Sequence, residues 1–429
     1  MTRALLQCIA LSCLAGCEAV TEFPLKVVLP EDSSSLDTAD NLTVTLTPTG
    51  ELVSQATVGT DFSVELDLPA DTLVQATLYL ARGSELLAWG RTPYFLDVSP
   101  SGLALFLGRP GQLSTLPRPI DDPDPQGLAA YLPNRGVTVL AGDGTMRLLS
   151  EYTLEFASGP TLPVAVEGRR AGLFTTSDGV VFVSWGSDSS AYRFDLETTT
   201  WVELSNDAPD ATEVEDDAPR AALYDTASHR HTGLVLYGSQ MLWRLQLETL
   251  DDGSDALSWS SPDGGAAPDG PRPGASAIAL PDDELLVFGS EQNQAVLWSS
   301  AVGAFGPAGP WTGGSCVLVD PEANPMRVLC AGGERDGAAV SDLLLLERDP
   351  DSGTWTVEER LDALPAALRD PLWFFDETAL YAQGAGQLLR IARDSLEPDN
   401  AVSSAQRFAE GHSVQLPTWK VAPVGRANR

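Results

Sequence analysis

The sequence predicts an all-β protein in two parts, a small domain of two stacked sheets followed by a larger series of repeated sheets. Three observations carry this prediction. Runs of alternating apolar residues recur from residue 23 onward, and 38 glycines and 31 prolines supply frequent turns. A strand-like run that ends in glycine then returns at intervals of 43 to 52 residues. With 429 residues, 43% of them hydrophobic, the chain is long enough for two or three domains with their own cores.

The first twenty residues, MTRALLQCIALSCLAGCEAV, predict export. Arg3 gives a positive start, and the mostly apolar segment 4–15 is too short to span a bilayer but has the length of a signal-peptide core. It ends in Leu14-Ala15-Gly16-Cys17, which resembles the lipobox of bacterial lipoproteins. An ordinary secretory signal whose cleavage site contains a cysteine is the alternative.

The lipobox resemblance implies that residues 1–16 are removed and that the Cys17 thiol carries the lipid. Residues 17–22 then form a short tether between the membrane and the first strand. Glu18 is not the aspartate that resembles an inner-membrane retention signal. We therefore expect a lipid-anchored protein of the cell envelope, at the outer membrane in a Gram-negative cell and facing either the periplasm or the surface.

Residues 23–108 predict a β-sandwich of about seven short strands. Apolar side chains alternate in LTVTLTP (42–48), DFSVELDLP (61–69) and VQATLYLA (74–81). The segment looks like an immunoglobulin-like or carboxypeptidase-regulatory-like module, without a cysteine or tryptophan signature to sharpen the resemblance. The proline- and aspartate-rich segment 109–126 then predicts a stiff linker between domains.

The repeated part covers residues 127–429. Its glycine-terminated runs are VTVLAG, VFVSWG, GLVLYG, ELLVFG, RVLCAGG and ALYAQG, which end at or within one residue of Gly142, Gly186, Gly238, Gly289, Gly332 and Gly384. Further marks recur in phase: an arginine opens three units and a tryptophan closes four, namely Arg170, Arg220 and Arg272, and Trp201, Trp259, Trp311 and Trp355.

These marks resemble the kelch repeat, most closely in FDLETTTW (194–201) and LERDPDSGTW (346–355). The resemblance implies a β-propeller of four-stranded blades, in which each closing tryptophan packs against the next blade. A large sandwich or an up-and-down barrel with accidental spacing is the alternative. Residues 407–425 resemble a further half-blade, which we expect strands from about 100–116 to complete. That count gives seven blades, with six as the alternative.

Cys316 and Cys330 flank a predicted turn in SCVLVDPEANPMRVLC. A turn centred near residue 323 places them opposite each other on an antiparallel strand pair, close to disulfide range. An exported protein with two cysteines outside its signal region favours the disulfide, and two buried free thiols are the alternative.

The chain is poor in residues for catalysis or metal binding. It has three histidines, of which His229 and His231 fall in a predicted turn and His412 matches a structural position of the kelch pattern. The frame that begins at Asp122 imitates a calcium loop, but its twelfth position is Pro133 instead of glutamate. A copper-oxidase site of the kelch type needs more histidines. We therefore expect no cofactor and no metal, and assign no catalytic residue.

A formal charge of −34 excludes nucleic acid as a partner. The acidic segment 206–220 reads as a solvated loop between blades, and the longer inserts 203–219 and 251–271 are expected to shape a binding face. The prediction is a monomeric binding or scaffold lipoprotein that recognises an envelope protein or a glycan. Two alternatives stay open: a carbohydrate-active enzyme with paired carboxylates, and an assembly protein that packs in an envelope complex.

Overall fold

The structure is a computed structural model of the whole chain, and it describes most of residues 21–396. Residues 1–20 and 397–429 lie outside the described part, as do internal stretches, the longer ones being 57–63, 96–102, 118–126, 262–274, 289–295 and 298–313, and some shorter segments. The described part is almost entirely β-structure, with one four-residue helix and one short 3-10 helix. The all-β prediction is therefore confirmed.

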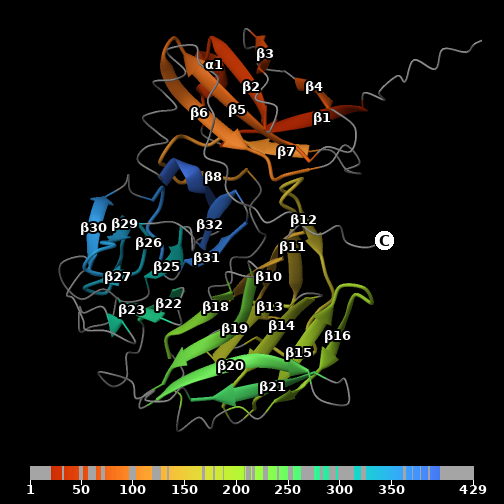
Figure 1. The fold of residues 1–429 in the computed structure, drawn as a ribbon, viewed down its shortest axis with the longest axis vertical. Helices are drawn as coiled ribbons and strands as arrows, with labels where there is room; N and C mark the ends of the chain where they lie inside the picture. The colour runs from red at the N-terminus through yellow and green to blue at the C-terminus, as the bar shows by residue number, and fades with distance from the viewer. Residues whose placement is uncertain are drawn as a thin grey trace, which may run out of the picture.

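The N-terminal module consists of two sheets that share one buried cluster (Figure 1). One sheet has the order β3-β2-β5-β6, and its strands are Asn41–Thr47 (β2), Leu52–Ala56 (β3), Gln75–Arg82 (β5) and Glu85–Arg91 (β6). The other has the order β4-β1-β7, with Thr21–Val28 (β1), Val64–Leu68 (β4) and Leu103–Phe106 (β7). Helix α1 covers Ser35–Thr38.

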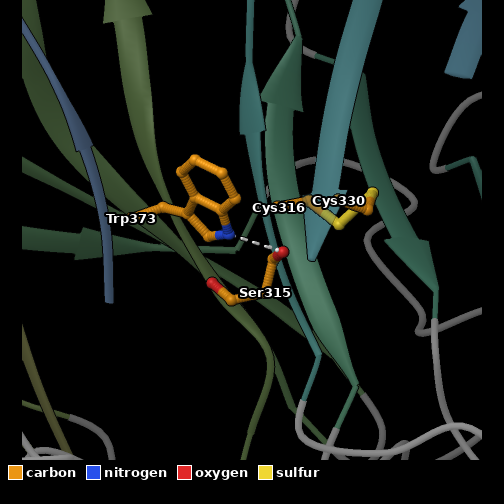
Figure 2. Close-up of a disulfide and its surroundings, with 4 residues drawn as sticks. All are labelled: Ser315, Cys316, Cys330 and Trp373. Atoms are coloured by element: carbon orange, nitrogen blue, oxygen red, sulfur yellow. Dashed lines mark hydrogen bonds between the residues drawn. A yellow bond between two sulfur atoms is a disulfide. The ribbon is translucent and has the colours of Figure 1, made fainter. Parts of the chain in front are cut away.

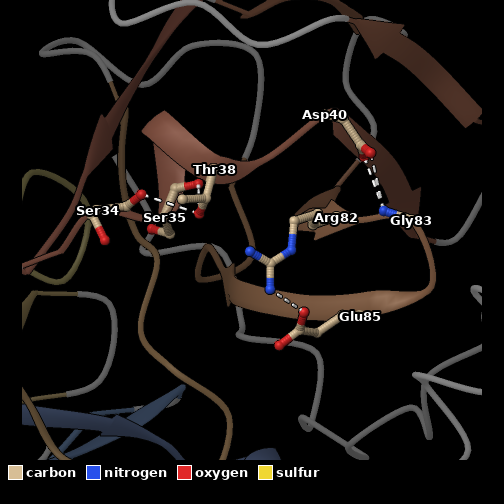
Figure 3. A network of polar contacts seen from close by, with 7 residues as sticks. All are labelled: Ser34, Ser35, Thr38, Asp40, Arg82, Gly83 and Glu85. Carbon is tan, nitrogen blue, oxygen red and sulfur yellow. Dashed lines mark hydrogen bonds and ion pairs between the residues drawn. The ribbon is translucent and has the colours of Figure 1, made fainter.

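Local contacts fix the edge of the first sheet (Figure 3). Both carboxylate oxygens of Asp40 accept a hydrogen bond from the backbone N–H of Gly83, at 3.1 Å each. Arg82 and Glu85 form an exposed ion pair across the same turn. The apolar positions predicted for 74–81, namely Val74, Ala76, Leu78 and Leu80, are fully buried. The residues between them are buried as well, so β5 is covered on both faces and its burial does not alternate.

Six further sheets of three to five strands make up most of the rest of the described structure, and we number them sheets 1 to 6. Sheet 1 contains β9 (Leu128–Leu132), β10 (Gly136–Leu140), β11 (Met146–Leu149) and β12 (Phe156–Ser158). Sheet 2 contains β13 (Ala171–Thr175), β14 (Gly179–Ser184), β15 (Ala191–Asp195) and β16 (Thr200–Glu203). Sheet 3 contains β18 (Arg220–Asp225), β19 (Arg230–Tyr237), β20 (Leu242–Thr249) and β21 (Asp255–Ser260), with the short β17 (Ser205–Asn206) beside β21.

The remaining sheets complete the series. Sheet 4 contains β22 (Ser276–Leu280), β23 (Glu284–Phe288) and β24 (Val296–Leu297). Sheet 5 contains β25 (Ser315–Leu318), β26 (Arg327–Ala331), β29 (Leu343–Arg348) and β30 (Trp355–Arg360). Sheet 6 contains β31 (Leu372–Phe375), β32 (Ala379–Gly384), β33 (Gln387–Ala392) and β8 (Ser114–Thr115), and the short helix η3 (Arg393–Leu396) follows it.

The six sheets form a closed ring (Figure 1). The first strand of each sheet contacts the first strand of the next, and β31 of sheet 6 contacts β9 of sheet 1. This radial arrangement of antiparallel sheets is that of a β-propeller. Each glycine-terminated run that the sequence singled out overlaps the second strand of one sheet, from β10 to β32.

The ring closes differently from the prediction. A strand from the predicted region, β8, does complete the last sheet, but it pairs with β33 at Leu389↔Thr115 and Arg390↔Ser114. The expected partner, 407–425, lies outside the described residues. Leu113 and Leu116 flank β8 and are buried, so the first part of the predicted linker belongs to the ring. What remains, 118–126, joins β8 to β9 and does not join the two domains.

The described closing tryptophans lie on fourth strands, as predicted, but they pack toward the preceding sheet and not toward the next one. Trp355 packs with Ile278, Leu280 and Leu286 of sheet 4, and Trp201 packs against a cluster that includes sheet 1. Both therefore contact the preceding sheet instead of the next one. Trp311 lies outside the described residues.

The two segments that carry the kelch resemblance fold alike. Asp195 accepts hydrogen bonds from the N–H groups of residues 197 and 198, and Asp349 does the same for 351 and 352. The fourth residue after each aspartate has a positive φ, 54° at Thr199 and 68° at Gly353. The same turn chemistry thus joins the third and fourth strands of sheets 2 and 5.

Candidate functional site

The candidate site lies on one side of the ring. Because neighbouring strands of each sheet are antiparallel, the turns between second and third strands share a side with the connections between sheets. We call this side the connection side. The turns between first and second and between third and fourth strands lie on the opposite side.

An aromatic cluster fills the connection side between sheets 2 and 3. Trp185 follows β14, Trp243 lies near the start of β20, and Trp259 lies near the end of β21. They share one cluster with Val214 and Ala218 of the connection between these sheets. We call this group of five residues the tryptophan cluster.

The hydrogen bonding of the three indoles is uneven. Trp259 Nε1 donates to Asn206 Oδ1 at 2.9 Å, and Asn206 Nδ2 donates to the carbonyl of Ser184 at 3.0 Å. The Nε1 atoms of Trp185 and Trp243 are buried and have no acceptor in the described structure. A buried donor without a partner costs about 1–3 kcal/mol, so the site contains two donors suited to an acceptor oxygen.

The sheet 3 edge of the cluster is more exposed than its sheet 2 side. Met241 is 39% exposed and precedes Trp243 by two residues, next to the short turn between β19 and β20. Trp243 itself is half-buried, whereas Trp185 is 2% exposed. A partner would meet Met241 and Trp243 first.

The acidic segment 206–220 is not simply the solvated loop that the sequence predicts. Val214 and Ala218 are 2% and 3% exposed because they pack beneath Trp185 and Leu236. The segment does join two sheets, as predicted. The insert predicted at 251–271 is partly wrong, since 255–260 is strand β21. The sequence did not reveal that these two segments share the tryptophan cluster.

A second feature of the connection side is a hairpin between β26 and β29, formed by Glu334–Arg335 (β27) and Ala338–Ala339 (β28). It is braced by the ion pairs Arg335–Asp342 at 2.6 Å and Arg369–Glu334 at 2.9 Å. Its tip is exposed. The Asp336-Gly337 dipeptide is a hairpin signal that could have predicted this element.

The two cysteines of sheet 5 lie where the sequence places them. Cys316 pairs with Cys330 in the register of β25 and β26, and a disulfide joins them (Figure 2). Beside them, Trp373 Nε1 of sheet 6 donates to the carbonyl of Ser315 at 2.8 Å. The sulfurs therefore lie next to an inter-sheet contact.

The other predicted residues are placed as follows. Cys17, His229 and His412 lie outside the described residues, as does the frame that begins at Asp122. His231 is in β19, after the predicted turn. Across the described ranges, no three His, Cys, Asp or Glu side chains gather as a metal site requires. No helix in the same ranges is long and apolar enough to cross a membrane.

A glycosidase would need two carboxylates that reach its substrate from opposite sides of the scissile bond. In the part of the chain that the structure describes, the buried carboxylates are Glu151 and Asp376, each 2% exposed. Glu151 accepts a hydrogen bond from Tyr131 Oη at 3.0 Å, and Asp376 accepts one from Tyr381 Oη at 2.5 Å. Both lie on the opposite side of the ring, away from the tryptophan cluster.

Comparison with known proteins gives distant structural matches. No family model and no curated protein matches the chain. Virginiamycin B lyase from Staphylococcus aureus is similar over 74% of this chain and 91% of its own, with 9% identity and a TM-score of 0.37. YCF48 bound to D1 peptide is similar over 74% and 89%, with 12% identity and a TM-score of 0.37. A fungal alcohol oxidase in complex with copper is similar over 76% and 69%, with 10% identity and a TM-score of 0.42.

Proposed function

We propose that this protein is an exported lipoprotein, anchored through Cys17, whose six-bladed propeller binds an envelope protein or a glycan at the tryptophan cluster. The observation that carries the binding role is the pair of buried indole donors, on Trp185 and Trp243, without an acceptor. Aromatic faces beside unpaired donors suit a ligand with apolar surfaces and oxygen acceptors, which describes a sugar ring or a peptide backbone.

The direction of β1 supports the anchoring role. β1 begins at Thr21, four residues after Cys17, and ends at Val28, which packs with residues of the ring. An eight-residue strand spans about 26 Å at roughly 3.3 Å per residue. The module, which we propose is a β-sandwich, would then act as a spacer that holds the ring away from the membrane.

Two measurements test this proposal. Mass spectrometry of the purified mature protein is expected to find a lipid-modified N-terminal residue 17, and Cys17→Ala is expected to release the protein from the membrane fraction. An unmodified protein that starts at another residue would refute the anchor. Binding is tested separately, by titrating the released protein with glycans and envelope-protein peptides while indole fluorescence is recorded. A ligand whose binding is unchanged in Trp243→Ala would refute the site.

The carbohydrate-active alternative has a weaker basis. It requires two carboxylates that reach the substrate, and the buried carboxylates of the described residues are both held by tyrosine hydroxyls. Hydrolysis of a bound glycan by the released protein would favour this alternative over simple binding.

A further inference from the structure

The boundary between sheet 6 and sheet 1 lacks the fourth-strand tryptophan that is found at three other inter-sheet boundaries of the described ring. In sheets 2, 3 and 5 the fourth strand carries a tryptophan, Trp201, Trp259 or Trp355, that packs toward the preceding sheet. The fourth strand of sheet 1 is β12, with the sequence Phe-Ala-Ser and no tryptophan. The boundary where the ring closes therefore needs another source of apolar surface.

The N-terminal module supplies that surface. Val28, Ala104 and Phe106 belong to the buried cluster that joins the facing surfaces of sheets 1 and 6. Phe106 is 1% exposed, and its neighbours in the cluster include Tyr381 of sheet 6 and Leu149 of sheet 1. Three module residues thus occupy the boundary between the first and last sheets of the ring.

A buried arginine ties Phe106 to sheet 6. The Arg390 guanidinium lies 5.5 Å from the ring centres of both Phe106 and Tyr381. Its Nε donates to Tyr381 Oη and its Nη2 donates to Thr378 Oγ1, each at 3.0 Å. Tyr381 in turn donates to Asp376. The charge of Arg390 is therefore stabilised on one side by sheet 6 and on the other by the module.

The backbone brings the two parts together at further points. The N–H of Ala104 donates to the carbonyl of Tyr152 in sheet 1 at 2.7 Å, and Tyr152 Oη donates to the carbonyl of residue 94 in the module at 3.3 Å. Inside the module, Gly90 allows β7 to approach closely, since a Cβ there would lie 2.0 Å from the carbonyl oxygen of Phe106. β7 then leads to β8 within eight residues.

We propose that the N-terminal module is the closing element of the ring, in which Phe106, held by Arg390, takes the place of the tryptophan missing from sheet 1. The module and the ring consequently behave as one rigid body without a hinge. This inference does not depend on the lipid anchor or on the tryptophan cluster.

Hydrogen exchange on the full chain tests the proposal, with Phe106→Ala compared to Phe95→Ala. Phe95 is the matched control because it is 2% exposed in the module's own core. We expect Phe106→Ala to speed amide exchange in β32, β33 and β10 at least tenfold, while exchange in β2 and β5 changes less than threefold. Phe95→Ala should affect β2 and β5 first. Exchange in β32, β33 and β10 that stays unchanged in Phe106→Ala would overturn the proposal.

A milder variant covers the case in which Phe106→Ala does not fold. Phe106→Leu keeps an apolar side chain but removes the aromatic face from Arg390, and we expect exchange in β33 to rise at least threefold. No rise in β33 would overturn the proposal.

A cleavage experiment gives an independent readout. A protease site placed at the Gly111 turn, between β7 and β8, cuts the chain between the module and the ring. Because the contacts of Phe106, Ala104 and Tyr152 do not need the intact chain, we expect the two fragments to elute together in size-exclusion chromatography. Fragments that separate under native conditions would overturn the proposal.

Discussion

The boundary between sheets 6 and 1 (the 6–1 boundary) and the boundary between sheets 2 and 3 (the 2–3 boundary) both combine buried aromatic side chains with polar groups, but they differ in how well those polar groups are paired. At the 6–1 boundary the side chains of Asp376, Thr378, Tyr381 and Arg390 hydrogen-bond to one another. Burial raises the pKa of Tyr381 well above its usual value, so the phenol stays protonated and donates to Asp376. At the 2–3 boundary two of three indole donors lack an acceptor.

The difference in polar pairing indicates that one boundary contributes to stability and the other to binding. Fully paired buried polar groups hold a structure in one arrangement, whereas unpaired buried donors lower stability unless a partner supplies acceptors. We therefore propose that the 6–1 boundary closes the ring and that the 2–3 boundary serves recognition.

The largest loss of stability is expected from a substitution at the 6–1 boundary. Asp376→Ala leaves the buried Arg390 charge without its counter-charge, which should lower the free energy of unfolding by about 3–5 kcal/mol. Denaturant unfolding measures this loss. As the milder control, Tyr381→Phe removes one hydroxyl that links the two groups and should cost about 1–3 kcal/mol. A cost below 1 kcal/mol for Asp376→Ala would remove the distinction between the two boundaries.

Substitutions of Trp259 and Trp185 at the 2–3 boundary give a smaller, matched test, because the indole N–H of Trp259 has an acceptor and that of Trp185 has none in the described structure. Trp259→Phe loses a hydrogen bond to Asn206 and should lower the free energy of unfolding by about 1–2 kcal/mol. Trp185→Phe also loses ring volume but removes an unpaired donor, so its net change should stay below about 1 kcal/mol, although Trp185 is more buried. Thermal unfolding under identical conditions compares them, and a larger loss for Trp185→Phe would contradict the account.

The smallest change in stability is expected at the aspartate turns of sheets 2 and 5, which lie at neither of the two boundaries. Backbone N–H groups hold the pKa of Asp195 and of Asp349 below the ordinary 3.8. A carboxyl whose pKa is lowered by folding stabilises the protein above its unfolded pKa, and this contribution disappears as the pH falls through the folded value. Asp195→Asn and Asp349→Asn should therefore flatten the decline of stability below about pH 4 slightly and equally. Unequal effects would show that the two turns are not equivalent.

Sequence periodicity predicted the parts of the fold that repeat. The glycine-terminated runs and the aspartate turns have local causes, such as a positive φ or a side chain that accepts backbone N–H groups. The direction in which Trp355 packs has no local signal, because strands at both neighbouring sheets are apolar. The role of Phe106 has no local signal either, since it depends on a contact with Arg390, which lies near the other end of the described chain.

The candidate site was predicted only in outline. The sequence indicated that the connection between sheets 2 and 3 shapes a binding face. Its acidic composition predicted a solvated loop, however, and gave no sign that Val214 and Ala218 are buried. Which indoles find acceptors depends on groups from three separate segments, namely Trp259, Asn206 and the backbone carbonyl of Ser184, and no spacing rule predicts that.

Photo-crosslinking in cells from two exposed positions, on opposite sides of the ring, tests directly whether recognition occurs at the tryptophan cluster. Met241 lies at the tryptophan cluster, and Thr198 lies in the turn between β15 and β16 on the opposite side. We expect one recurring partner to be captured from Met241, to be absent from Thr198, and to be lost in Trp243→Ala. Equal capture from both positions, or capture from Thr198 alone, would contradict the assignment of recognition to the 2–3 boundary.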